Sequence, residues 1–516
     1  MTTKSSAPLA QRAGKREWFA LGALALPALL ITLDSTVLYL AIPQLSASLN
    51  PSGTQLLWIV DVYSFMIASL LIVAGTLSDR IGRRRLLLIG AAGFGVASLL
   101  TAFSVSAEML IVSRVLLGVA GATLMPSSMS LIQNMFTDPR QRSVAFSVWI
   151  ACFLAGGIIG PLVGGVMLEN FWWGSVFLLG VPAMVLLLVL GPVLLPEYRN
   201  PEPGRIDVTS VALLIVGLLT SVYGVKKLAG ANTGPLAVPA LALGLALGVA
   251  FVLRQRRIDS PLIDLRLFRE RTFSVPLGAM GLALFTMAGS QLFVAQYLQM
   301  VVGLSPFATG LCSLPASVGG VAGSLLAPLL LKRMRPAAVM TTGLVIAVVG
   351  FGVLIQINSD NGVVVAVVAL GLLNFGVAPT VALGTDMMIS SAPPAQAGAV
   401  SAISETTHEV GLGTGIAVLG SIGTSVYHGQ VSGNLPDGLP ENSVPAFLDT
   451  IGSAADEASR LPGHLGSAAF DVARAAFTHG LFVISVVCLA VTVLATAAVT
   501  LLLRRGSTEG ETVDNA

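Results

Sequence analysis

Fourteen long apolar runs constrain this chain more than any other feature of its sequence. Each run is close to the roughly 20 residues that a helix needs to cross the hydrocarbon core of a bilayer. Only 10% of the 516 residues are charged, whereas soluble domains carry about 25%. The sequence therefore predicts an all-α integral membrane protein. The runs cover 18–43, 56–77, 86–106, 109–132, 143–167, 174–195, 207–228, 235–253, 273–300, 307–331, 337–357, 362–388, 398–426 and 478–503.

The positions of Lys and Arg predict the orientation, because basic loops stay on the cytoplasmic side. With the N-terminus inside, 23 of the 28 Lys and Arg residues fall in cytoplasmic segments, 4 fall outside and Arg114 lies within a run. An even number of spans then places both termini in the cytoplasm. The run at 18–43 is too long for the 7–15-residue core of a secretory signal peptide, so we interpret it as the first span.

Ionisable residues inside spans are the candidate functional groups. Such a residue costs at least about 2.5–3.5 kcal/mol at the centre of a membrane helix, so it is functional by default. The candidates for proton and substrate coupling are Asp34, Asp61, Arg114, Glu405 and Glu409.

The acids among these candidates suit the exchange of a cation for a proton. A carboxylate in apolar surroundings can hold one proton or one cation, which is the minimal chemistry of an antiporter, and Asp34 is placed to do so. Glu405 and Glu409 are four residues apart, hence on one helix face. Asp61 is interpreted either as a second cation or proton site or as a polar residue that lines the mouth. Buried Arg114 needs backbone carbonyls or a carboxylate as partners.

A dense charged turn, GTLSDRIGRRRLL from Gly75 to Leu87, joins the second and third runs. Gly75 is predicted to permit close contact with another helix, and Asp79 to lie at a helix N-terminus, where the dipole favours an anion. A cluster of arginines that only set the topology would not need glycines and an aspartate at fixed places.

The fifth run carries G-x3-G-P-x2-G-G, formed by Gly156, Gly160, Pro161, Gly164 and Gly165. Proline removes a helix hydrogen-bond donor and glycines allow close approach of backbones. The run predicts a kinked, tightly packed helix that acts as a hinge or as a seal.

These motifs resemble those of the major facilitator superfamily. The turn at 75–87 is similar to its signature loop, and LIVSRVLLGVAGA around Arg114 is similar to its arginine motif, with Leu117 in place of the usual glutamine. The run in the fifth span resembles the antiporter motif of proton-coupled drug exporters. Together they resemble the fourteen-helix drug:proton antiporter family, of the quaternary-ammonium exporter kind.

The resemblance implies the major facilitator fold and proton-driven export of lipophilic cationic drugs, such as quaternary ammonium biocides and dyes, across the bacterial cytoplasmic (inner) membrane. It also implies that the turn at 75–87 is a cytoplasmic gate that stabilises an outward-open state. Its predicted gating residues are Gly75, Asp79, Arg80, Gly82, Arg83 and Arg84, and the three arginines are expected to form ion pairs.

Two six-helix bundles of this fold leave two helices over, most simply those at 207–253. Their ionisable residues, Asp207, Lys226 and Lys227, lie at the helix ends, so we interpret the extra pair as a structural spacer. The predicted domains are a cytoplasmic tail (1–17), the first bundle (18–195), the two extra helices (207–253), a cytoplasmic connector (254–271), the second bundle (273–503) and a second cytoplasmic tail (504–516).

An insertion at 427–478 falls outside, between the last two spans. It carries six acids and two bases, and apolar residues recur at helical spacing on both sides of Pro462-Gly463. It is predicted to form a short amphipathic helical hairpin over the outer mouth. Its acidity could gather cations, and a solvated cap explains it equally well.

The expected partners are lipophilic cations, protons and the lipid bilayer. No nucleic acid, metal or cofactor is expected, since the proton gradient supplies the energy, and the chain is expected to be a monomer. The absence of a nucleotide loop, metal cluster or nucleophile–base set argues against an enzyme. Two alternatives stay open: an exporter of an endogenous metabolite, antibiotic or lipid, and a membrane receptor. The aromatic residues that could offer cation–π contacts are Tyr39, Trp58, Trp149, Phe153, Phe293 and Tyr297.

Overall fold

The computed structural model describes residues 13–199, 207–229, 235–258, 265–358, 361–391 and 397–510. Regular structure in this part of the chain is helical throughout. Fourteen of its helices are long and apolar enough to cross a membrane, which confirms the predicted spans.

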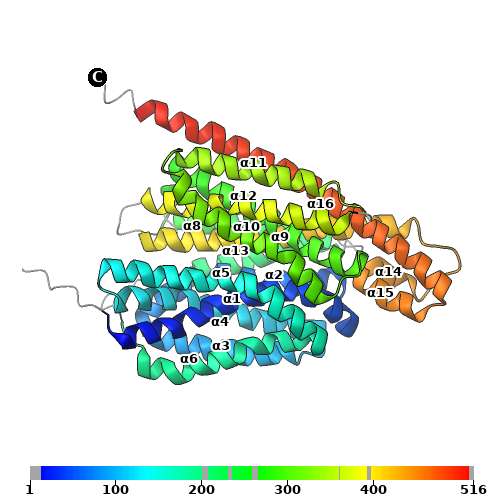
Figure 1. Cartoon of the computed structure of the whole chain (residues 1–516), viewed down its shortest axis with the longest axis horizontal. Coiled ribbons are helices and arrows are strands. Elements are labelled where there is room, and N and C mark those ends of the chain that lie inside the picture. Colours follow the sequence, from blue (N-terminus) through cyan, green and yellow to red (C-terminus); the bar gives the residue numbers. More distant parts are fainter. Residues whose placement is uncertain are drawn as a thin grey trace, which may run out of the picture.

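The first bundle lies on one side of the molecule (Figure 1). Serine side chains fix where two of its helices begin: Ser52 accepts a hydrogen bond from the Gln55 backbone, and Ser106 from that of Met109. The bundle consists of α1 (Lys15–Leu49), α2 (Gly53–Ile81), α3 (Arg83–Ala102), α4 (Ala107–Met135), α5 (Pro139–Asn170), the short η1 (Trp173–Leu179) and α6 (Gly180–Leu194).

The second bundle lies on the other side (Figure 1). Its helix α10 begins after Ser305, whose side chain accepts a hydrogen bond from the Ala308 backbone. The bundle consists of η2 (Leu267–Arg269), α9 (Arg271–Gln296), η3 (Tyr297–Val301), α10 (Pro306–Leu330), α11 (Pro336–Leu354), α12 (Gly362–Ser390), α13 (Ala397–Ser432) and α16 (Gly463–Gly510).

The two extra helices, α7 (Val208–Ala229) and α8 (Ala237–Gln255), pack against each other. Asp207, just before α7, accepts two hydrogen bonds of 2.9 Å from the Arg254 guanidinium. These bonds hold the pKa of Asp207 well below its usual range. Helix α7 also contacts α2 and α13, one from each bundle, so the extra pair is in contact with both bundles.

One end of the molecule carries the insertion at 427–478, where α14 (Val444–Asp449) and α15 (Ile451–Arg460) form. We call this the hairpin end. The first turn of α1 and the last turn of α16 lie at the opposite end, the terminal end (Figure 1). The sequence pattern separates the second arm of the hairpin from the last span at 478, whereas the structure joins them in the single helix α16.

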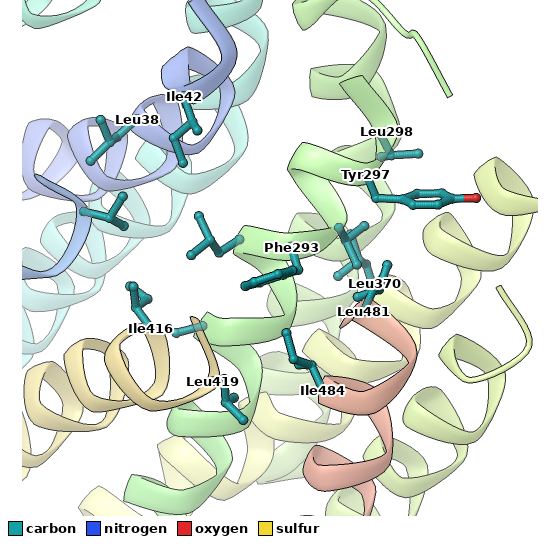
Figure 2. Packing of buried hydrophobic residues seen from close by; sticks show 14 of the residues in the cluster. Leu38, Ile42, Phe293, Tyr297, Leu298, Leu370, Ile416, Leu419, Leu481 and Ile484 are labelled. Atoms are coloured by element: carbon teal, nitrogen blue, oxygen red, sulfur yellow. The ribbon is translucent and has the colours of Figure 1, made fainter. Parts of the chain in front are cut away.

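An apolar cluster joins the two bundles on the side of the hairpin end. Leu38 and Ile42 of α1 face Phe293 of α9 and the α13 residues Ile416 and Leu419 (Figure 2). All five side chains are buried. The hairpin adds a polar contact across the same junction, because the Gly53 amide of α2 donates a hydrogen bond of 3.5 Å to Asp449. The bundles are therefore closed against each other at this end.

Candidate transport site between the bundles

An ion pair between α1 and α4 lies at the centre of the first bundle. The Arg114 guanidinium donates a hydrogen bond of 2.5 Å to the Asp34 carboxylate and one of 3.2 Å to the Ile59 carbonyl. Its flat face lies 4.6 Å from the centre of the Tyr63 ring. The Arg114 side chain is 1% exposed and that of Asp34 is 10% exposed. A fixed positive charge thus stands beside a carboxylate that keeps some access to solvent.

Two glutamates of α13 face the same region from the second bundle. Glu409 is buried beside Ser64 of α2, and Glu405, one turn away, is half-buried. Neither glutamate forms an ion pair within the described ranges. The Tyr63 ring packs on the Arg114 guanidinium, its chain neighbour Ser64 lies beside Glu409, and Tyr39 of α1 lies near Glu409 and Arg114. These interactions bring acids of both bundles into one cluster.

Asp61 of α2 also has a cationic partner, and it comes from an extra helix. The Lys226 ammonium of α7 donates a hydrogen bond of 2.7 Å to Asp61, and both side chains are 0% exposed. The same ammonium lies 3.8 Å from the centre of the Trp58 ring. Lys226 lies in the last turn of α7, as predicted, but its side chain is buried against α2 instead of reaching water.

The glycines of α5 bring its backbone against helices of both bundles. A Cβ at Gly156 would overlap the Leu29 carbonyl of α1, and a Cβ at Gly160 would overlap Thr36. A Cβ at Gly164 would stand 2.6 Å from Val37, and one at Gly165 would stand 2.7 Å from Phe307 of α10.

The contact of α5 with the second bundle continues along α10. The Pro161 backbone leaves no room for a Cβ at Gly310 of α10. Ser317 of α10 donates a hydrogen bond of 3.1 Å to the Gly157 carbonyl. Helix α5 therefore packs closely against α1 of the first bundle and against α10 of the second, and so connects the two bundles.

A family model described as Major Facilitator Superfamily matches residues 24–416. The chain belongs to this superfamily. It is accordingly a transporter and not an enzyme, and a multi-pass protein of the bacterial inner membrane.

Similar proteins are known by sequence and by structure. This facilitator is 44% identical to the multidrug efflux pump LfrA of Mycolicibacterium smegmatis, over 95% of this chain and 97% of the relative. It is 34% identical to the methyl viologen resistance protein SmvA of Salmonella typhimurium, over 90% and 93% of the two chains. In fold it is similar to a bacterial homologue of the human lysosomal transporter Spinster, with a TM-score of 0.65, 17% identity, and coverage of 95% and 98%.

The signature loop of this facilitator connects mainly within the first bundle. Gly82 has a φ of 111°, which favours glycine. The Arg83 guanidinium donates a hydrogen bond of 3.0 Å to the Ser130 carbonyl and lies 4.7 Å from the Tyr198 ring centre. Arg84 lies 3.6 Å from Glu197, so one predicted ion pair of the loop is present. Its partner, Glu197, was not among the predicted site residues.

The structure describes the surroundings of two further predicted gating residues, Gly75 and Arg80, but not the side chain of a third, Asp79. No described residue lies within 4 Å of the place where a Cβ at Gly75 would stand, so the predicted close helix contact is not made in this conformation. Arg80 is exposed and forms no ion pair with the described residues. The side chain of Asp79 lies outside the described residues.

The six candidate aromatic residues divide into two groups. Tyr39 and Trp58 lie at the charged cluster, as given above. The other four pack: Trp149 stacks on Phe153, Phe293 stacks on Phe477, and the fully buried Tyr297 donates a hydrogen bond of 2.9 Å to the Asn358 carbonyl. Tyr297 is thus a core residue in this structure, whereas Phe293 also lines a small cavity beside Asp449 at the hairpin end.

The bundles contact each other from the hairpin end inward along two helix pairs. In one pair, Leu57 of α2 packs on Gly420 of α13, and further from the hairpin end Thr406 of α13 donates a hydrogen bond of 3.5 Å to the Ala68 carbonyl. In the other pair, the contact runs from Gly165 to Ser317, as described for α5. Gly75, nearer the terminal end, lacks a close neighbour among the described residues. The charged cluster thus lies below a closed hairpin end.

The described part of the chain contains no group of three or more His, Cys, Asp and Glu residues arranged to hold a metal ion. Two residues that contact the candidate charges, Lys226 and Tyr63, were not predicted from the sequence. Lys226 follows an apolar run directly and has a second lysine after it, which is a weak sign that one of the two side chains turns inward.

Proposed function

We propose that this facilitator is a proton-coupled antiporter that exports lipophilic cationic compounds. The observation that carries the proposal is the contrast between the bundles. Asp34 and Asp61 of the first bundle each hold a protein cation, whereas Glu405 and Glu409 have none among the described residues. The glutamates of α13 are the negative charges left for a cationic substrate.

The same glutamates provide a means of coupling. Two carboxylates one helical turn apart interact and share protons. A cation that binds between the bundles competes with those protons, so each displaces the other. Asp34 is the acid beside the fixed charge of Arg114 and keeps some exposure, which suits it to take up and release a proton as the site opens to either side.

The direction of transport follows from the predicted membrane topology and from the contact between the bundles at the hairpin end. The predicted topology makes the terminal end cytoplasmic. With the hairpin end closed, the charged cluster is then poised to receive a compound from the cytoplasm. In the outward-open half of an alternating-access cycle, α2 would separate from α13 and α5 from α10, and the bound compound would be released outside.

The named activities of the relatives agree with the export of cations. One is a multidrug efflux pump and another confers resistance to methyl viologen. Methyl viologen is a flat aromatic dication, which two unpaired glutamates would complement.

Transport in inverted membrane vesicles tests the proposal. Energised vesicles that contain the wild-type protein should accumulate ethidium while protons leave the lumen. Glu405→Gln and Asp34→Asn should each reduce ethidium accumulation by at least about tenfold. A tenfold loss corresponds to about 1.4 kcal/mol of interaction free energy from the missing charge. Asp437→Asn changes an exposed acid of the hairpin and should have no effect.

Two results would contradict the proposal in different ways. If the wild-type protein moves no lipophilic cation, the substrate class is wrong, and an exporter of a metabolite, antibiotic or lipid becomes the better hypothesis. If it moves ethidium without any proton movement, the coupling is wrong and the substrate class stands.

A further inference from the structure

The pair of Lys226 and Asp61 has no role in the exchange described above. Both side chains are fully buried, and taking two charged groups out of water costs free energy that their attraction does not always repay. Its lysine comes from α7, one of two helices that a twelve-helix facilitator does not need. The pair therefore gives the extra helix a direct contact with the charged cluster.

Packing places this contact at the junction of the two bundles. Phe65 of α2, Val222 of α7 and Ala417 of α13 form one buried apolar cluster, which Trp58 extends. Lys226 lies one helical turn after Val222, and its ammonium passes along the Trp58 ring to reach Asp61. Helix α7 thus fills the groove between α2 and α13 and inserts one positive charge there.

Asp61 lies within electrostatic range of the residues proposed to bind the substrate. Asp61 and Ser64 are three residues apart on α2, hence on one helix face, and Ser64 lies beside Glu409. The positive charge of Lys226 therefore changes the potential felt by a cation in the cluster, because interactions between charges are weakly screened in a buried site.

The charges of the cluster can be counted. Asp34 with Arg114, and Asp61 with Lys226, form two neutral pairs. Glu405 and Glu409 then leave two negative charges before any proton binds. Without Lys226 the cluster would carry three.

We propose that Lys226 is a specificity-determining residue of transport: by neutralising Asp61 it sets the number of negative charges that the site presents, and so the relative transport of monocations and dications. This inference rests on the proposed function. It assigns the extra helix pair a part in substrate selection, beyond that of a spacer.

The test compares a dication with a monocation in the same vesicles at neutral pH. The probes are methyl viologen and ethidium, and the readout is the ratio of their transport rates. Lys226→Gln leaves Asp61 without its cation and should raise the ratio of dication to monocation by about fivefold or more, the lower end of couplings between sites. Asp61→Asn alone should lower the ratio, because it leaves an extra positive charge.

Two further variants separate charge from structure. The double variant Asp61→Asn with Lys226→Gln carries the same net charge as the wild type and should return the ratio to the wild-type value. Lys227→Gln is the matched control, since Lys227 is the neighbouring lysine and forms no ion pair with the described residues, and it should leave the ratio unchanged.

The outcomes distinguish this inference from the proposed function. If the wild type moves both cations and Lys226→Gln slows both in equal proportion, Lys226 acts only in packing and the inference is overturned. An unchanged ratio in Lys226→Gln, with normal rates, overturns it as well. If the wild type moves neither cation, the proposed function fails and the selectivity role of Lys226 fails with it.

Discussion

At the scale of single residues, buried charges in this facilitator are held by partners from distant parts of the chain. Arg114 has a carboxylate, a carbonyl and an aromatic face around it. Such a set offsets the cost of taking a guanidinium out of water. Removal of one partner leaves the arginine poorly compensated, so the pair with Asp34 should contribute to stability as well as to transport.

We therefore expect Asp34→Asn to destabilise the protein by about 3 kcal/mol, the lower end of the cost of breaking a buried pair, because Asp34 keeps some exposure. Thermal unfolding in detergent, followed by tryptophan fluorescence, measures the effect. The double variant Asp34→Asn with Arg114→Met removes both charges and should be more stable than Asp34→Asn alone. Equal stability of the two variants would show that the arginine does not need the carboxylate.

At the scale of elements, the contact between α1 and α5 depends on particular glycines. Gly156, Gly160 and Gly164 recur along one face of α5, and the atoms of α1 lie where their side chains would be. Gly157 lies beside this face. A Cβ there would stand 3.5 Å from the Thr32 methyl group, an ordinary van der Waals contact. The two neighbouring positions differ in tolerance because the helix turns about 100° per residue.

This difference predicts unequal effects of one added methyl group. Gly156→Ala should force α1 away from α5 and lower stability by about 1–3 kcal/mol, the usual cost of overpacking, with a matching loss of transport. Gly157→Ala is the control and should retain both. Unfolding temperature and ethidium accumulation measured on the same preparations check the prediction. Similar behaviour of the two variants would mean that α1 and α5 are not held this closely.

At the scale of the whole molecule, transport requires the closed hairpin end to open. Gly53 of α2 and Thr424 of α13 meet across the bundles there, since a Cβ at Gly53 would stand 3.2 Å from the Thr424 methyl group. The cysteines Cys152, Cys312 and Cys488 are free and can be replaced by alanine to give a clean background.

In that background, the double variant Gly53→Cys with Thr424→Cys should form a disulfide on oxidation. We expect this disulfide to abolish ethidium transport, because α2 can no longer separate from α13, and a reductant should restore it. Each single cysteine variant serves as a control and should be insensitive to oxidation. Transport that continues after complete cross-linking would contradict the rocking of one bundle against the other.

The fourteen spans, the candidate charges and the close-packing glycines could all be predicted from the order of the residues. These are properties of residue type and local pattern: an apolar run long enough to cross the bilayer, a carboxylate inside it and a glycine where backbones must approach. The signals for Asp34, Arg114 and Gly156 could all be read without knowing which helices meet.

Which charges neutralise each other could be seen only once the helices were placed in space. Lys226 and Asp61 are 165 positions apart, and Lys226 lies at a helix end where a lysine usually reaches water. Its direction depends on α7 fitting between α2 and α13. Tyr297 likewise became a core residue through the helices that cover it. Pairing and burial depend on the packing of remote helices, which no local pattern encodes.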